Sequence, residues 1–427
     1  MERNRAIDRR QARWTPDRRD LLGAALALPL AACGRRRDPG RVSFWAIDVE
    51  GENAKYVLPA FARATGLPVD LQWLAWTAAH EKLLTAYAGG SLPDVFMVSR
   101  AWVTEFATIG AIAPVPAMAA DLLHDSYQAR AIDVRGRAMA VPWTVDLAVQ
   151  YYRRDLLAAA GYPAPPRDLF AWRDMLRAVK RRQRDGYAVL MQLNWPDHLL
   201  HIAEQQPDPP LRDDQSRGNF SSPGFRAALA FYVSLFAEGL APRVSSMEAA
   251  DPVGDLARGW VAVYNAGAWN RAELLLRRQD VLPRERWAAA PMPGRGGPAR
   301  APIAGAVLCV SRTAADPARA WALVRHLVSR DAGLTLYRMS GALPAQPGTW
   351  PMLGRDPTLA AFRDALTRPA PGHNLVEWDR IAGEVQLVAE QVVRGRLTID
   401  AAVAEMDRRA DAILTKRRWM LERGRIA

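Results

Sequence analysis

Several tryptophans in this sequence stand close to a carboxylate, an amide or a histidine, and such combinations suit the binding of sugars. A sugar has an apolar face of C–H groups, which an indole ring can cover, and a rim of hydroxyl groups that need hydrogen-bond partners. Desolvating those hydroxyl groups without partners is costly, so a sugar site needs both kinds of residue. The combinations fall at expected strand ends or loops: Trp143 with Asp146, Asn194 with Trp195, Trp269 with Asn270, and Trp378 with Glu377 or His373.

Motifs for other chemistry are absent from the sequence. No expected strand is followed by Gly-x-Gly-x-x-Gly, and neither a Gly-Lys-Ser/Thr phosphate loop nor a Gly-x-Ser-x-Gly elbow occurs. His198 and His201 could share one helix face, but without further ligands we favour packing over metal binding. We therefore expect no metal and no cofactor. A hydrolase with two carboxylates about 5–9 Å apart stays open as an alternative.

The net charge of +12 and the pI of about 10.2 raise the question of nucleic-acid binding. Lysine occurs only four times, and arginine is scattered along the whole chain. Short basic clusters lie in an expected linker or at expected helix ends, where cations face water or complement the helix dipole. We expect no nucleic-acid partner.

The N-terminal segment has the three parts of a secretory signal. The apolar run from Leu21 to Ala32 is too short to span a bilayer. The paired Arg18 and Arg19, followed by Leu21 and Leu22, fit the twin-arginine export pattern. Leu-Ala-Ala-Cys-Gly, with Cys33, resembles the bacterial lipobox, in which the cysteine becomes the lipidated first residue. An ordinary cleaved signal with an incidental cysteine is the alternative. Cys309, in an apolar run, is expected to be buried.

Strands and helices alternate after the leader, which predicts an open α/β domain with a parallel sheet. We expect strands at 42–47, 69–73 and 95–98, with helices at 52–64 and 77–88. Ligands of such domains bind at the carboxyl ends of the strands. The residues there are Asp48, Glu50, Trp76, Ser99, Arg100 and Trp102.

Three expectations concern the second half of the chain. Ser222 and Pro223 predict the start of a helix that ends before Gly239. The polar stretch 205–221 is expected to form an exposed, irregular loop. The turns after Lys416 are expected to fray.

Ordered motifs across nearly all of the expected mature sequence resemble the extracellular solute-binding proteins of carbohydrate-importing ABC transporters. These are Val-Ser-Phe-Trp at 42–45, Gly-Gly-Ser-Leu-Pro-Asp-Val-Phe at 89–96, Val141-Pro142 through Arg153-Arg154-Asp155, Gly267-Ala268-Trp269, Ala304-Gly305-Ala306 and Gly341-Ala342-Leu343-Pro344. The segment Leu169 to Asp174 departs from the family's usual Pro-x-Thr-Trp-Asp/Glu-Glu. That departure weakens the local match and leaves the expected site in place.

The resemblance implies a two-lobed periplasmic-binding-protein-like fold, each lobe an open sheet flanked by helices, with hinge crossings between them. We expect a signal peptide at 1–32, a tether at 33–41, an N-terminal lobe of 42–145 and 292–345, and a C-terminal lobe of 146–291 and 346–427. Ligand would bind between the lobes, and closure of the lobes would be read by a membrane permease.

The resemblance also places Trp143 and Asp146 where the chain first crosses between lobes, which makes them the leading ligand-binding pair. Gly305 joins the expected site. The implied protein is a non-enzymatic monomer that is exported and anchored to the membrane through Cys33, with a sugar or oligosaccharide as ligand and ABC permease subunits as partners. A receptor for a polyol phosphate or a polyamine remains the alternative, and Arg100 keeps the phosphate possible.

Overall fold

The computed structural model describes residues 40–427 except 125, 128–131, 184, 371–374 and 425–427. The expected signal peptide and nearly all of the tether, with Cys33, lie outside the described residues, as does His373. Among the helices that are described, none has the length and apolar character needed to cross a membrane.

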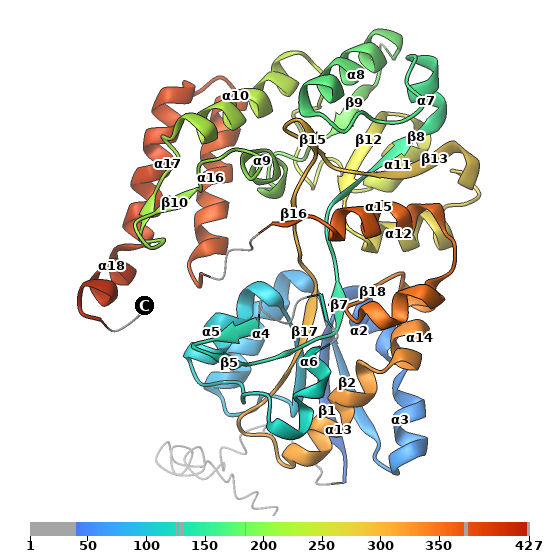
Figure 1. Ribbon diagram of the computed structural model, residues 1–427, viewed down its shortest axis with the longest axis vertical. Coiled ribbons are helices and arrows are strands. Elements are labelled where there is room, and N and C mark those ends of the chain that lie inside the picture. Colours follow the sequence, from blue (N-terminus) through green and yellow to red (C-terminus); the bar gives the residue numbers. More distant parts are fainter. Residues whose placement is uncertain (1–39, 125, 128–131, 184, 371–374, 425–427) are drawn as a thin grey trace, which may run out of the picture. The chain divides into compact units, whose positions relative to one another are not determined.

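The N-terminal lobe is built on a five-stranded sheet (Figure 1). In spatial order its strands are β2 (Val69–Leu74), β1 (Val42–Ile47), β3 (Val95–Ser99), β17 (Ala306–Val310) and β6 (Val141–Pro142). β1 pairs in parallel with β2 and β3, which confirms the expected parallel arrangement, whereas β17 runs antiparallel to β3. The sheet therefore combines the first hundred residues with a strand from much later in the chain.

Helices bury the apolar faces of this sheet. They are α2 (Asp48–Ala54), α3 (Leu58–Thr65), α4 (Trp76–Ala88), α5 (Val103–Thr108), α13 (Pro317–Leu327) and α14 (Arg330–Ser340). The expected single helix at 52–64 is wrong, because a turn at 55–57 divides it into α2 and α3. The end at Gly66 is confirmed: its φ of 71° is a left-handed conformation that glycine adopts without strain. Cys309, fully buried in β17, belongs to the core of this lobe, as expected.

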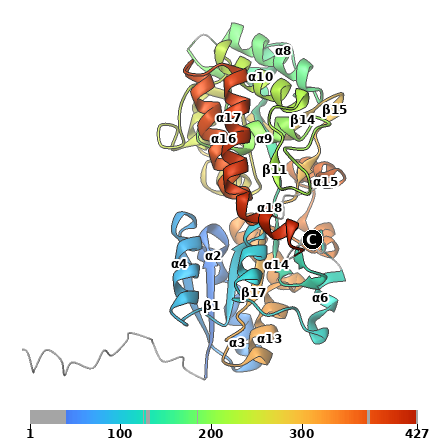
Figure 2. The same ribbon diagram turned by 90° about the vertical axis from the view of Figure 1, so that its left-hand side faces the viewer.

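The C-terminal lobe has a four-stranded sheet in the order β13 (Trp287–Pro291), β8 (Val149–Arg153), β12 (Val261–Ala266) and β9 (Tyr187–Leu190). Its main helices are α8 (Leu169–Arg182), α9 (Asp197–Ala203), α10 (Pro223–Ala237), α11 (Pro252–Arg258), α15 (Pro357–Leu366), α16 (Trp378–Val393) and α17 (Ile399–Ile413). The expected start of α10 is confirmed, since the Ser222 side chain accepts a hydrogen bond from the Phe225 amide. Figures 1 and 2 both show α16 and α17 side by side.

Three separate stretches of chain meet where the lobes join. β7 (Thr144–Val145) pairs with β18 (Leu343–Pro344), and Asp146 exchanges two backbone hydrogen bonds of 2.8 Å with Ala304. Before that point the hairpin of β14 (Pro293–Gly294) and β15 (Gly297–Pro298) stays beside α8, where the Gly294 amide bonds to the Arg167 carbonyl. We propose that the N-terminal lobe resumes near Ala304, later than the 292 expected from sequence.

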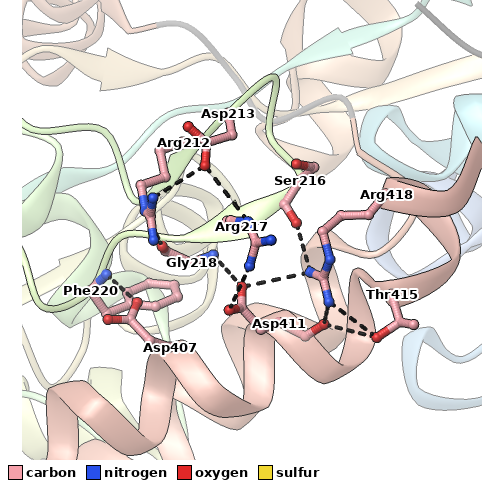
Figure 3. Close-up of polar contacts among 10 residues, drawn as sticks. All are labelled: Arg212, Asp213, Ser216, Arg217, Gly218, Phe220, Asp407, Asp411, Thr415 and Arg418. Atoms are coloured by element: carbon pink, nitrogen blue, oxygen red, sulfur yellow. Dashed lines mark hydrogen bonds and ion pairs between the residues drawn. The ribbon is translucent and has the colours of Figure 1, made fainter. Parts of the chain in front are cut away.

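The segment 205–221 contains a hairpin of β10 (Leu211–Arg212) and β11 (Arg217–Gly218), so the expectation of an irregular loop is wrong there. Phe220 is fully buried, and α17 holds the hairpin through two carboxylates (Figure 3). Asp407 accepts from the Phe220 amide at 2.7 Å, and Asp411 accepts from the Gly218 amide at 2.9 Å. The hairpin could not be predicted from its own polar composition, because its partners on α17 lie nearly 200 residues away in the sequence.

The chain beyond α17 is also ordered into a helix, α18 (Thr415–Glu422). Arg418 in α18 donates to the Ser216 carbonyl of the hairpin at 2.9 Å and to the Asp411 carbonyl at 2.7 Å (Figure 3). The expected fraying after Lys416 is therefore wrong as far as Glu422. α18 has no buried residue, and the long-range hydrogen bonds of Arg418 stabilise it in place of apolar packing.

Candidate functional site

Asp48 lies at the carboxyl end of β1, where the backbone turns sharply into α2. Its φ of 42° is uncommon for a residue other than glycine. Its carboxylate accepts a hydrogen bond of 2.9 Å from the Trp76 amide at the start of α4, and its carbonyl accepts one of 2.8 Å from the Trp73 indole. The carboxylate thus satisfies a free amide of a helix N-terminus and ties the ends of β1 and β2 together.

Trp76 and Trp102 pack against each other beside this turn. Their ring centroids are 5.2 Å apart with an interplanar angle of 33°. Trp102 is 9% exposed and donates its indole N–H to Asp379 at 3.2 Å, whereas Trp76 is 46% exposed. Trp76 consequently presents an indole surface that Trp102 holds in place.

Ser99 and Arg100 follow the third strand. The Ser99 hydroxyl accepts from the Ala101 amide, and the Arg100 amide donates to the Gly305 carbonyl at 3.3 Å. The Arg100 guanidinium has no hydrogen bond or ion pair with another described residue, and burial lowers the pKa of Arg100. A partly buried cation that is unpaired within the described part of the chain is available here for an anionic or hydroxyl-bearing ligand group.

Glu50, in α2, is joined to the first crossing between the lobes by Thr144. The Thr144 hydroxyl donates to the Glu50 carboxylate at 3.2 Å and accepts from the Ala306 amide at 3.1 Å. The pKa of Glu50 is raised from 4.5 to about 7, chiefly by burial and in smaller part by the charge of Asp146, although hydrogen bonds to the carboxylate oppose the shift. Burial thus favours the protonated form of Glu50, and a protonated carboxyl group can both donate to and accept from a ligand hydroxyl.

Asp146 is the second carboxylate of the crossing, and it faces the C-terminal lobe. It accepts from the Leu147 amide at 2.8 Å and from the Ala268 amide, just after β12, at 2.7 Å. Burial raises the pKa of Asp146 from 3.8 to about 6, although these two backbone bonds oppose the shift. Gly267 makes this approach possible, because a Cβ at that position would lie 2.2 Å from the Asp146 carboxylate.

Trp269 follows directly and begins α12 (Trp269–Ala272), with 45% of its surface exposed. Its expected companion Asn270 is 3% exposed and lies beside Tyr264, so Asn270 is placed inside the lobe. The expected pair therefore does not act together: the Trp269 indole is exposed, whereas the Asn270 amide is buried inside the lobe.

Asn194 and Trp195 lie at the carboxyl end of β9, the strand parallel to β12. Both amide atoms of Asn194 are engaged by Ser246, one with its amide and one with its hydroxyl, each at 2.8 Å. Trp195 is 42% exposed and donates its indole N–H to Asp197 at 2.9 Å. Trp378 begins α16 and packs in part against the core of the C-terminal lobe.

Trp143 is not placed with Asp146, in contrast to the leading expectation. It is 2% exposed, packs edge-on against Phe44 at 5.9 Å, and donates its indole N–H to the Leu327 carbonyl at 3.2 Å. These contacts belong to the core of the N-terminal lobe. The structure gives Trp143 a packing role and leaves Asp146 with Glu50 and Thr144.

Sequence reasoning did not include Thr144 and Gly267 among the candidate site residues. Thr144 had no signal beyond its place between Trp143 and Asp146. Gly267 had one, since it opens the Gly-Ala-Trp motif and a glycine after a strand indicates close approach of another group. Within the described parts of the chain, no group of three or more His, Cys, Asp or Glu residues could hold a metal ion.

Comparison with known proteins finds a matching family and similar solved structures. Residues 57–357 match the family described as bacterial extracellular solute-binding protein. The sugar-binding protein MalE from the phytopathogen Xanthomonas citri is 36% identical, with a TM-score of 0.82, and the match covers 90% of this chain and 99% of that one.

Two more distant structures share the fold. A solute-binding protein of Thermotoga lettingae, bound with α-D-tagatose, is 20% identical with a TM-score of 0.76 over 88% of this chain and 99% of its own. The GacH receptor of Streptomyces glaucescens, solved with acarbose, is 19% identical with a TM-score of 0.78 over 88% and 98%. At these identities the two structures show that the two-lobed α/β fold is shared.

Proposed function

Because this chain belongs to the bacterial extracellular solute-binding proteins, we propose that it is the receptor of an ABC transporter that binds a sugar or oligosaccharide between its two lobes. The ligand-loaded protein delivers its cargo to the permease subunits. The identity of 36% to a sugar-binding protein over 90% of the chain supports a sugar in particular.

The observation that carries the proposal is the set of groups around Asp146. The carboxylates of Glu50 and Asp146, the Thr144 hydroxyl and the exposed indole of Trp269 come from both lobes and from the crossing between them. Together they supply an apolar ring surface and hydroxyl partners, which is what a sugar requires. Trp76 and Trp195 add two further exposed indoles at strand ends.

Arg100 favours one alternative ligand. Its guanidinium, unpaired among the described residues, suits the phosphate of a polyol phosphate. A polyamine would instead need the carboxylates charged. Burial of Glu50 and Asp146 disfavours their charged forms, so this ligand is less suited to the site.

A binding screen tests the proposal. The purified protein is titrated calorimetrically with maltose, D-glucose, D-xylose, D-tagatose, sorbitol, sorbitol 6-phosphate and spermidine. We expect one-to-one binding of a sugar, with stabilisation of about 2.7 kcal/mol at a hundredfold excess over Kd. Binding of sorbitol 6-phosphate or spermidine alone would replace the sugar assignment, and catalytic turnover of maltose would contradict a receptor.

The site of action follows from the leader and is part of the same proposal. The protein is exported and tethered to the extracytoplasmic face of the membrane through a lipid on Cys33. The membership of an extracellular family supports export. The Leu-Ala-Ala-Cys-Gly motif supports the lipid.

A further inference from the structure

A small cavity of about 20 Å³ lies within the C-terminal lobe, apart from the carboxylates described above. Its walls include Trp172 of α8, His198 and His201 of α9, Asn265 of β12, and Arg300. By the same measure, about 10–15 Å³ is enough for one water-sized group. The cavity can therefore admit a single hydroxyl group, but not a sugar ring.

Two nearly buried side chains in these walls lack partners among the described residues. Both amide atoms of Asn265 and the Nε2 atom of His198 are buried without a hydrogen bond, and each residue is 6% exposed. A buried polar group without a partner costs about 1–3 kcal/mol. Three such atoms at one cavity indicate that a polar group belongs there.

The cross-strand neighbour of Asn265 provides a contrast. Gln150 on β8 pairs directly with Asn265 in the sheet, and its amide is fully used. It donates to the Pro291 carbonyl at 2.7 Å and accepts from the Trp172 indole at 2.9 Å. The missing partners of Asn265 are thus a property of this cavity, and not of amides in this sheet.

The chemistry of the cavity suits an uncharged hydroxyl. Burial lowers the pKa of His198 to about 3, so its ring is neutral at physiological pH. A neutral imidazole and an amide together offer donors and acceptors, and a hydroxyl both donates and accepts. Near the cavity, burial also lowers the pKa of His201 and raises that of Glu204 to about 8, while Arg300 lies exposed at one wall.

β12 and the residue that follows it relate the cavity wall to the carboxylate site. Residues two apart on an extended chain share a face, so Gly267, just after the strand, lies on the side of Asn265. Gly267 is the residue against which the Asp146 carboxylate rests. Two residues of a strand span about 7 Å. A protein atom that hydrogen-bonds the hydroxymethyl oxygen of a sugar lies at about the same distance from the sugar ring.

We propose that the cavity lined by Asn265 and His198 is a subsite that receives one hydroxyl or hydroxymethyl group of the bound sugar. This inference rests on the proposed function. Under this proposal, residues inside the C-terminal lobe select among sugars, in addition to Glu50, Thr144 and Asp146 at the crossing between the lobes.

D-glucose and D-xylose differ by one hydroxymethyl group and serve as the binding probes. Calorimetry should give the wild type at least about tenfold tighter binding of glucose. Asn265→Leu should lose that preference by weakening glucose and leaving xylose unchanged, and His198→Leu should act in the same direction. A preference that survives both substitutions overturns the inference.

A second measurement needs no ligand. Asn265→Leu removes unpaired polar atoms, so the thermal midpoint of the ligand-free protein should stay equal or rise. Gln150→Leu is the matched control on the neighbouring strand, and it should lower the midpoint by several degrees because its amide is paired. A similar drop for Asn265→Leu would mean a permanent structural water, which overturns the subsite.

The two proposals fail in different ways. If no sugar binds the wild type, the proposed function is wrong. The ligand-free comparison still decides whether the cavity lacks a permanent partner. If sugars bind and Asn265→Leu changes neither their affinity nor their ranking, only the subsite is wrong.

Discussion

Glu50 keeps its proton to a higher pH than an exposed glutamate does, because its carboxylate is buried and Asp146 adds a nearby like charge. Its pKa is raised from 4.5 to about 7, so the folded state keeps the proton over a range in which the unfolded chain has released it. The stabilisation is fully present below about pH 4.5 and is lost as pH rises through 7. Asp146, with its pKa raised to about 6, acts in the same direction.

Glu50→Gln should therefore stabilise the protein at pH 8 and change little at pH 4.5. Glutamine resembles the protonated acid, so the cost of burying a charge disappears, and we expect a gain of about 1–3 kcal/mol at pH 8. Thermal unfolding at the two pH values measures it. The exposed Glu52→Gln on the same helix is the control, and equal effects of Glu50→Gln at both pH values would contradict the assignment.

Trp269 offers an indole that is 45% exposed next to the amide held by Asp146. Trp269→Ala should weaken the binding of the sugar found in the screen by about tenfold or more, as expected for a tryptophan in the centre of a contact. Its effect on thermal stability should be small. Trp419→Ala, at a 39% exposed tryptophan of α18, is the control. Equal affinities for the two variants would remove Trp269 from the site.

Asp407 and Asp411 show how an element with little apolar surface is held. Asp407 also accepts from the Ser221 amide at 3.0 Å, so one carboxylate satisfies two backbone donors at the end of the hairpin. A Cβ on Gly218 would lie 2.7 Å from the same carboxylate, which leaves no room for a side chain there. The hairpin and α17 are thus fitted to each other at close range.

Asp407→Ala should release this hairpin without affecting the ligand site. The loss of two hydrogen bonds to a charged acceptor costs about 1–3 kcal/mol and should lower the thermal midpoint by a few degrees. Limited proteolysis should find new cleavage within 205–221, and sugar affinity should not change. Asp400→Ala on the same helix, where the side chain is 86% exposed, should have little effect. A fall in sugar affinity in Asp407→Ala would connect the hairpin to the site.

Local pattern was enough to predict most of the early elements. Buried β-forming runs predicted β1, β2 and β3, and Gly66 and Ser222 marked helix ends, because these signals act within a few residues. The turn between α2 and α3 was missed. The hairpin at 205–221 and α18 were missed because their partners, Asp407, Asp411 and Ser216, are remote in sequence.

Position along the chain predicted the placement of the candidate site residues better than composition did. Asp48, Glu50, Trp76 and Asp146 were found from strand ends and the crossing, and the structure places their polar groups there. Trp143 was chosen partly because an indole beside a carboxylate suits a sugar, yet its ring faces the core. Composition cannot say which way a buried-strand side chain turns, whereas packing against Phe44 and Leu327 decides it.

The whole protein, as we propose it, works at a membrane surface. Cys33→Ser removes the sulfur that would carry the lipid, and one or two acyl chains determine whether such a protein stays bound. Fractionation of cells should move the receptor from the membrane to the soluble exported fraction, with its sugar affinity unchanged. Retention of the Cys33→Ser protein on the membrane would show that the lipid is not its anchor.

Cys309 leaves the protein open to site-specific labelling at introduced cysteines. It is the one cysteine after Cys33, it is fully buried in β17, and burial raises the pKa of its thiol far above the ordinary value. A thiol that stays protonated and unreachable does not react with maleimide reagents. A protein that begins after Cys33 can therefore carry spin labels or fluorophores at Met118→Cys and Met247→Cys, which are 64% and 86% exposed, with Cys309 left in place. The native sequence is already suited to spectroscopic distance measurements with and without sugar.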